Sequence, residues 1–234
     1  MMVACFVLCG ISLAILIYYI IIKCQRYDLK ELFVKTLLSL LFVVLALIAT
    51  FNSGKFNIFN LLVITGLVCG LIGDILLDLK NIDLERTVGY TYGGFVAFGL
   101  GHIMFITALI MNYFKGNALY IIFPILLDIV ISLITIFMEK PLKLEYGKMK
   151  PTVFMYALCL FGTFSFSLSL AIQNGFQITS LNMFLIGSIL FATSDLVLSG
   201  TYFGKDKERP IDFIMNYLTY YGAQYVIAFL LLFA

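Results

Sequence analysis

Long apolar runs, each about as long as a bilayer-spanning helix, follow one another along the whole chain. Short polar segments separate them. Because lipid offers the backbone no hydrogen-bond partners, such runs are expected to be α-helices. The pattern predicts an all-α polytopic membrane protein, a bundle of eight transmembrane helices in a single domain, residues 1–234. The predicted spans are 2–22, 32–51, 57–79, 89–113, 118–138, 151–172, 179–203 and 212–234.

The amino-acid composition supports a chain that lies in lipid. Hydrophobic residues make up 62% of it and charged residues 12%, whereas a soluble domain has about 25% charged and 45–50% apolar residues. The formal net charge of +2 is too small to indicate a nucleic-acid partner. The 5 cysteines include no CxxC pair, so neither a disulfide framework nor a zinc knuckle is indicated.

Basic residues give the predicted orientation. All but Lys55 and Lys115 of the 15 Lys and Arg residues lie in or beside the first, third, fifth and seventh polar breaks. These residues are Lys23, Arg26, Lys30, Lys35, Lys80, Arg86, Lys140, Lys143, Lys148, Lys150, Lys205, Lys207 and Arg209. The positive-inside rule places that side in the cytoplasm. We therefore expect both termini on the non-cytoplasmic side, of the cell membrane in a bacterium or of the endoplasmic reticulum in a eukaryote.

A few polar side chains fall within the predicted spans, where a charge costs at least about 2.5–3.5 kcal/mol on insertion scales. Asp74 and Asp195 are predicted to lie roughly 9 and 15 Å inside the cytoplasmic end, from the helical rise. His102, the only histidine, and Gln224 fall near the middle of their spans. Such residues are candidate functional groups. Asp78 is equally well a boundary residue, and Asp128 has no assigned role.

Two of these residues end stripes of small residues at helical spacing. Gly66, Gly70 and Gly73 precede Asp74 on one face, and a similar stripe begins at Gly187 and reaches Asp195. Small residues let helices approach closely.

Because the two stripes repeat the same interval, we predict two parallel four-helix repeats, residues 1–116 and 117–234. A pseudo-twofold axis along the membrane normal would relate them. The two aspartates would then form a pair that shares one proton.

Four short segments also resemble a known family. They are Gly73-Asp74-Ile75-Leu76-Leu77, Phe98-Gly99-Leu100-Gly101-His102-Ile103, Leu190-Phe191-Ala192-Thr193-Ser194-Asp195 and Thr219-Tyr220-Tyr221-Gly222-Ala223-Gln224. In this order and spacing the chain resembles the YhhN-like membrane proteins, which include the eukaryotic lysoplasmalogenases. The family often has Lys-Pro where this chain has Lys35-Thr36.

The resemblance implies an eight-helix fold and hydrolysis of the vinyl ether bond of a lysoplasmalogen. The products would be a fatty aldehyde and a glycerophospho-ethanolamine or -choline. By motif, Asp74 and Asp195 carry over as catalytic acids, and His102 and Gln224 as site residues. Tyr221, Ser194 and Lys35 are expected to support the site or to bind substrate.

Vinyl ether hydrolysis begins when an acid protonates the β-carbon, which leaves an oxocarbenium ion at the α-carbon. The site therefore needs a protonated acid, an anion near the oxocarbenium ion, and a water molecule positioned by a base. Two buried aspartates can supply the first two, with one protonated and one ionised. Which aspartate takes which role stays open. His102 or Gln224 could orient the water. Lys35, Lys150 and Arg209 are expected first as topology anchors, with contact to the lipid phosphate as the alternative. One histidine is too few for an ordinary catalytic zinc site, so neither metal nor cofactor is expected.

Other protein classes also place acids inside a membrane. A proton-coupled transporter of lipids or small molecules would show broken helices at equivalent places in both halves, yet only Pro124 falls within a span. An intramembrane aspartyl protease and a structural lipid-binding protein are further alternatives. The expected partners are a lysophospholipid substrate and membrane lipid, and the oligomeric state stays open.

Overall fold

Eight long α-helices account for most of the chain. The computed structural model describes residues 2–23, 29–204 and 209–234, so Arg26, Lys205 and Lys207 of the predicted basic side lie outside the described residues. The helices are α1 Met2–Lys23, α2 Leu29–Ser53, α3 Ile58–Leu79, α4 Thr87–Tyr113, α5 Leu119–Phe137, α6 Lys150–Gln173, α7 Thr179–Phe203 and α8 Pro210–Phe229. Short 3-10 turns lie at Leu84–Arg86, Gly147–Met149 and Leu230–Leu232.

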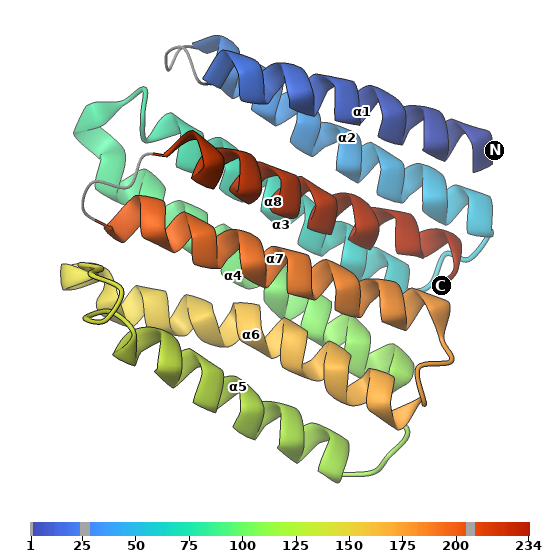
Figure 1. The fold of residues 1–234 in the computed structure, drawn as a ribbon. Helices are drawn as coiled ribbons and strands as arrows, with labels where there is room; N and C mark the ends of the chain where they lie inside the picture. The colour runs from blue at the N-terminus through green and yellow to red at the C-terminus, as the bar shows by residue number, and fades with distance from the viewer. Residues whose placement is uncertain (1, 24–28, 205–208) are drawn as a thin grey trace.

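The helices run alongside one another as a single bundle with both termini at the same end (Figure 1). In the described ranges, 7 helices are long and apolar enough to cross a membrane. The exception is α8, whose polar residues include Asp212, Asn216 and Gln224. It packs against α7, α2, α1 and α3, and Asn216 and Gln224 are buried among these helices, whereas Asp212 pairs with Arg209 at the start of the helix. The prediction of an all-α polytopic bundle is confirmed.

Local sequence explains where several helices begin. Asn57 precedes α3, and its side chain accepts a hydrogen bond of 2.9 Å from the backbone N–H of Asn60. This contact satisfies one of the backbone donors left open at a helix start. Pro151 and Pro210 lie in the first turns of α6 and α8, where proline's missing N–H is not needed.

The closest packing joins α3 to α4 through glycine. A side chain on Gly73 would come within 2.6 Å of the Phe98 ring, and one on Gly94 would meet Leu77. A side chain on Gly66 would lie closer still to its neighbour, the Phe105 ring. The predicted glycine stripe therefore packs helices, and it fixes the face of α3 that carries Asp74.

The two halves of the chain pack in a matching pattern. Neighbouring helices contact one another from α1 to α4 and again from α5 to α8. Between the halves, α2 packs on α8 and α4 packs on α6, two contacts that a parallel twofold would exchange. The duplication itself stays a prediction.

The two ends of the bundle differ in charge. At one end α1, α3, α5 and α7 finish while α2, α4, α6 and α8 begin (Figure 1). We call it the basic end, because its helix ends and connections carry most of the cations. Those within the described residues are Lys23, Lys30, Lys80, Arg86, Lys140, Lys143, Lys148, Lys150 and Arg209.

Candidate active site

A cavity of about 780 Å³ extends into the bundle from the basic end. Exposed residues such as Asn81 and Leu142 line its mouth. Asp74 of α3 and Asp195 of α7 line the interior. The fold therefore brings the two aspartates, which are far apart in sequence, to one cavity.

The walls of this cavity differ in polarity. Helices α2, α3 and α8 contribute Lys35, Asp78 and Asn216 beside Asp74. The wall from α5, α6 and their connection is mostly apolar, and Thr135 and Tyr156 are its polar residues on these two helices. Its apolar lining residues include Ile131, Ile134, Met138, Val153, Ala157, Leu160 and Phe161. Such a space suits a ligand with one polar and one apolar end.

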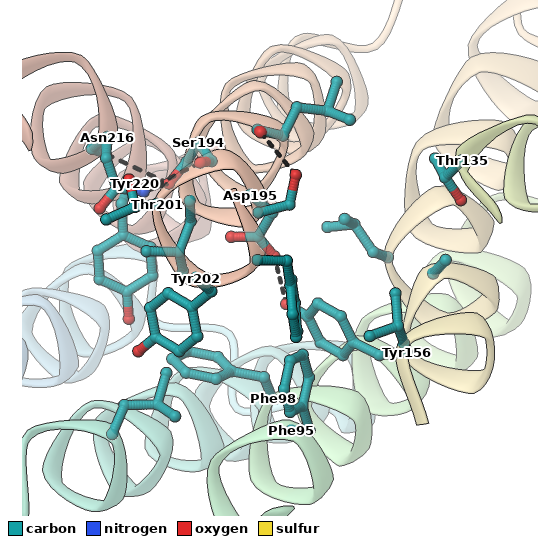
Figure 2. Close-up of a pocket in the computed structure, with 18 of the residues that line it drawn as sticks. Phe95, Phe98, Thr135, Tyr156, Ser194, Asp195, Thr201, Tyr202, Asn216 and Tyr220 are labelled. Atoms are coloured by element: carbon teal, nitrogen blue, oxygen red, sulfur yellow. Dashed lines mark hydrogen bonds between the residues drawn. The ribbon is translucent and has the colours of Figure 1, made fainter. Parts of the chain in front are cut away.

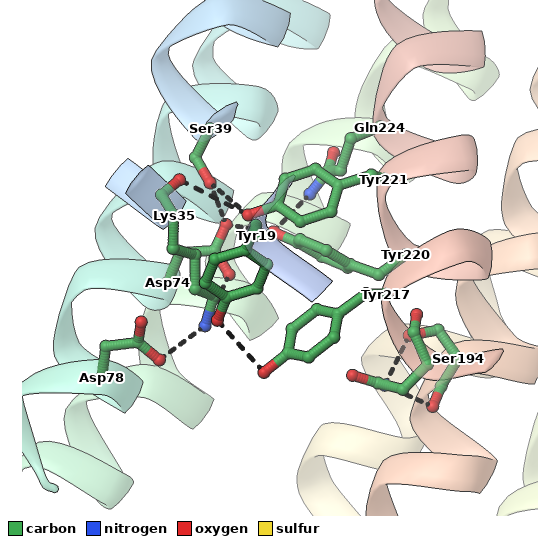
Figure 3. A network of polar contacts seen from close by, with 11 residues as sticks. Tyr19, Lys35, Ser39, Asp74, Asp78, Ser194, Tyr217, Tyr220, Tyr221 and Gln224 are labelled. Carbon is green, nitrogen blue, oxygen red and sulfur yellow. Dashed lines mark hydrogen bonds and ion pairs between the residues drawn. The ribbon is translucent and has the colours of Figure 1, made fainter. Parts of the chain in front are cut away.

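Asp74 is surrounded by groups that stabilise a negative charge (Figure 3). Its Oδ2 accepts hydrogen bonds of 2.6 Å from the Ser39 hydroxyl and 2.6 Å from the Tyr220 hydroxyl. The Lys35 ammonium lies 3.5 Å from its Oδ1. Asp74 is 3% exposed, so a charge here depends on these contacts rather than on water.

Lys35 joins Asp74 to Asp78. Its Nζ donates to Oδ1 of Asp78 at 2.8 Å, and both side chains are buried. Asp78 is therefore part of an internal ion cluster and is no boundary residue. Lys35 is fixed beside the carboxylates by these two contacts.

Asp195 has a different environment (Figure 2). It accepts a short hydrogen bond from the Tyr156 hydroxyl of α6. Among the described residues, no salt bridge joins it to a Lys, Arg or His. Each aspartate has its own hydroxyl partners, and the pair with one shared proton stays a prediction.

His102 lies behind the cavity wall rather than in it. Its Nδ1 is 3.0 Å from the Thr163 hydroxyl, and its ring packs 4.7 Å from that of Phe191. The Tyr156 ring lies between this region and the cavity, 6.0 Å from the imidazole. His102 does not line the cavity, so the expectation that it orients a water there is not supported.

Gln224 and Tyr221 also act from behind the cavity. Gln224 donates a hydrogen bond of 3.0 Å to the Tyr220 hydroxyl, which in turn donates to Asp74. The Tyr221 hydroxyl is 3.3 Å from that of Ser39. Both residues orient the donors around Asp74, and neither lines the cavity, so a water-orienting role for Gln224 is not supported either.

The remaining predicted residues hold helices together. Ser194 lines the cavity and donates 3.2 Å to the carbonyl of Asn216, whose amide returns hydrogen bonds of 2.9 Å to Ser194. These contacts link α7 to α8. Asp128 lies outside the cavity and accepts a hydrogen bond of 3.2 Å from Ser132 on its own helix.

The connection between α5 and α6 covers part of the mouth. Leu144 pairs with Gly204 in an antiparallel bridge, and Tyr146 packs edge-on against Phe203. Glu139 accepts hydrogen bonds from the Tyr146 backbone at 3.0 Å and from the Lys150 ammonium at 2.6 Å. The contact with Lys150 lowers the pKa of Glu139 below the ordinary value.

These contacts change the set of cations expected to meet a phosphate. Lys150 is engaged with Glu139, and Arg209 forms a 2.9 Å ion pair with Asp212. Neither lines the cavity. Within the described ranges, no group of three His, Cys, Asp or Glu side chains is arranged to hold a metal ion.

Three residues of the site were not expected from sequence. Ser39 lies one helical turn after Lys35, and that spacing alone places both on one face of α2. Tyr220 stands within one of the resembling segments. Tyr156 carries no such signal, because a tyrosine in an apolar run also suits a lipid-facing position.

The fold and the site together define a polytopic α-helical membrane protein with a carboxyl-lined, amphipathic cavity. The chain belongs to the YhhN family, whose model matches residues 30–231. Comparisons with curated proteins and with solved structures found no match.

Proposed function

We propose that this protein is a membrane-embedded ether hydrolase that cleaves the vinyl ether bond of lysoplasmalogens. The observation that carries the proposal is an amphipathic cavity in which two of the lining carboxyl groups, Asp74 and Asp195, have unlike environments. Acid-catalysed cleavage through an oxocarbenium ion needs such a pair, as in glycoside hydrolysis.

The surroundings of the carboxyl groups support a division of roles. Asp74 has a cation and two hydroxyl donors, so it acts as the anion. Asp195 has only a hydroxyl donor among the contacts described, and a partly buried carboxyl without a cation costs less free energy as the neutral acid. Asp195 is therefore the general acid.

In the proposed reaction Asp195 transfers its proton to the β-carbon of the vinyl ether. The α-carbon becomes an oxocarbenium ion, which the Asp74 carboxylate stabilises electrostatically. Water adds to the α-carbon and returns a proton to Asp195, giving a hemiacetal. The hemiacetal then collapses to a fatty aldehyde and a glycerophospho-headgroup.

The apolar wall suits the alkenyl chain. A volume of about 780 Å³ lies within the usual range of ligand sites, about 300–1,000 Å³. Ile134 of α5 and Leu196 of α7 both line the cavity, yet they are 50% and 53% exposed. We propose that a membrane lipid enters from the side between α5 and α7, where these two exposed residues line the cavity.

The basic end is assigned to the cytoplasm by the positive-inside rule. Both termini are then non-cytoplasmic, in the cell membrane or the endoplasmic reticulum according to the organism. A lysolipid of the cytoplasmic leaflet would reach the cavity with its headgroup at the aqueous mouth.

The test is release of aldehyde from lysoplasmalogen by the purified protein in detergent, followed by mass spectrometry. Asp74→Asn and Asp195→Asn are each expected to lower kcat at least about 10²-fold, because each removes an interaction needed in the transition state. Asp128→Asn is the matched control, since Asp128 lies within a span but outside the cavity. It should keep near-normal turnover.

Near-normal turnover in both site variants would contradict the mechanism. Lipid uptake into sealed liposomes without aldehyde release would instead favour a transporter.

A further inference from the structure

Lys80 and Tyr202 meet at the mouth of the cavity. The Lys80 Nζ lies 3.3 Å from the centre of the Tyr202 ring, and both residues line the cavity. A cation this close to an aromatic face is attracted by the ring quadrupole. The contact directs the ammonium to the polar mouth, where the cavity meets water.

The backbone that carries Lys80 is also fixed. Lys80 is the C-terminal cap of α3, and its N–H bonds back to the Leu76 carbonyl at 3.3 Å. Its carbonyl accepts a hydrogen bond of 3.1 Å from the Thr87 hydroxyl at the start of α4. The position of the lysine is thus set by two helices before its side chain reaches the ring.

The second cation of the cavity lies deeper. Lys35 and Lys80 are the Lys and Arg residues that line it in the part of the chain that the structure describes. Lys35 lies at the level of the carboxylates, between Asp74 and Asp78. Lys80 follows Asp74 along α3 by about 9 Å of helix, toward the basic end.

On α7, the distance along the helix from Asp195 to Tyr202 is similar to that from Asp74 to Lys80 on α3. From Asp195 to Tyr202 the helix advances roughly 10 Å in the same direction. The cavity therefore holds Asp74 and Asp195 at one level and the Lys80 ammonium on a tyrosine ring at another, with Asp78 between the two levels along α3.

A lysophospholipid has the same spacing between its reactive bond and its charge. Seven bonds separate the β-carbon of the vinyl ether from the phosphorus atom, roughly 8–9 Å when extended, from ordinary bond lengths. With the vinyl ether between Asp74 and Asp195, the phosphate therefore reaches the level of Lys80.

From this match we infer that Lys80, held by Tyr202, is the binding site for the headgroup phosphate of a lysophospholipid. The ammonium supplies up to three charge-assisted hydrogen-bond donors to the phosphate. The inference rests on the proposed function for its choice of lipid, and it assigns the residue that places the lipid in register with the carboxyl groups.

The test measures binding of ligands that cannot be cleaved. Purified protein in detergent is titrated with a 1-O-alkyl lysophospholipid and with the matching 1-O-alkylglycerol, which lacks phosphate. The wild-type protein is expected to bind the phospholipid at least about tenfold more tightly, the value of one charge-assisted contact. Lys80→Gln should remove this preference without changing alkylglycerol affinity.

Three further variants separate the effects of the charge and of the ring from general effects. Lys148→Gln removes an exposed cation of the same end that does not line the cavity, and it should keep the preference. Tyr202→Phe keeps an aromatic face and should bind as the wild type does. Tyr202→Leu removes the face and should weaken phospholipid binding several-fold.

The inference is wrong if the wild-type protein does not distinguish the two ligands, or if Lys80→Gln leaves the preference intact. Displacement of the lipid by inorganic phosphate at equal concentration would indicate a free-anion site and would also overturn it. Because neither ligand contains a vinyl ether, the binding result does not depend on hydrolysis. A Lys80-dependent preference without aldehyde release from lysoplasmalogen would refute the proposed function alone.

Discussion

Replacing Lys35 with methionine tests how the internal charges of the site are balanced. The Lys35 Nζ lies 2.8 Å from Asp78 and 3.5 Å from Asp74, and all three side chains are buried. Methionine keeps a similar apolar stem and removes the charge. Asp74 and Asp78 then remain in the bundle without the cation between them.

The expected loss is large because only one partner of a buried ion pair is removed, which costs about 3–5 kcal/mol. For a protein of this size that corresponds to a fall of roughly 6–20 °C in the unfolding midpoint. The assay is thermal unfolding in detergent, monitored by circular dichroism and by retention of monodisperse protein. A second variant, Lys35→Met with Asp78→Asn, removes one of the carboxylates and should recover part of the loss.

Lys30→Met is the control, because Lys30 is an exposed cation near the start of the same helix. An exposed charge contributes at most about 1 kcal/mol, so this variant should unfold close to the wild-type midpoint. Equal midpoints for Lys35→Met and Lys30→Met would refute the reasoning. No recovery in the double variant would show that Asp78 is not the group destabilised.

Ile134→Trp should obstruct the proposed entry between α5 and α7 and slow hydrolysis roughly tenfold at an unchanged unfolding midpoint. Leu133→Trp is the control, because Leu133 is on the same helix but outside the cavity, and it should keep the wild-type rate. Equal rates of aldehyde release from the two variants would contradict the entry route. Lys150 lowers the pKa of Glu139 below 4.5, the ordinary pKa of a glutamate side chain. Their contact therefore stabilises the fold above pH 4.5, and this contribution disappears as the pH falls through the lowered pKa of the folded state. Glu139→Gln should therefore unfold slightly below the wild type at pH 7 and together with it in acid, and a pH-independent difference in thermal midpoints would exclude this origin.

Much of the fold could be predicted because lipid imposes simple rules on sequence. Runs of about twenty apolar residues must become helices, and the predicted spans agree with the observed helices to within a few residues. The glycine stripe before Asp74 correctly indicated close packing, here with Phe98 of α4. The same stripes placed Asp74 and Asp195 on inward faces, and both line one cavity.

The finer arrangement of the site could not be predicted in this way. Helical periodicity gives the face on which a residue lies, but neither its neighbours nor the depth at which a cavity ends. His102 and Gln224 lie on inward faces, yet aromatic rings such as those of Tyr156 and Tyr220 stand between them and the cavity. From the sequence, Lys80 is predicted only to help set the orientation in the membrane. Its contact with the Tyr202 ring joins two helices that are distant in sequence, so the pattern of residues does not predict it.

The unlike walls of the cavity also bear on how a reaction cycle would end. An aldehyde with a long hydrocarbon tail partitions into the bilayer, whereas a glycerophosphodiester partitions into water. A cavity with the proposed side opening and a charged mouth would let each product leave into the phase that dissolves it. Under the proposed reaction, the two halves of the lipid would diverge after cleavage, and their separation into different phases would oppose recombination.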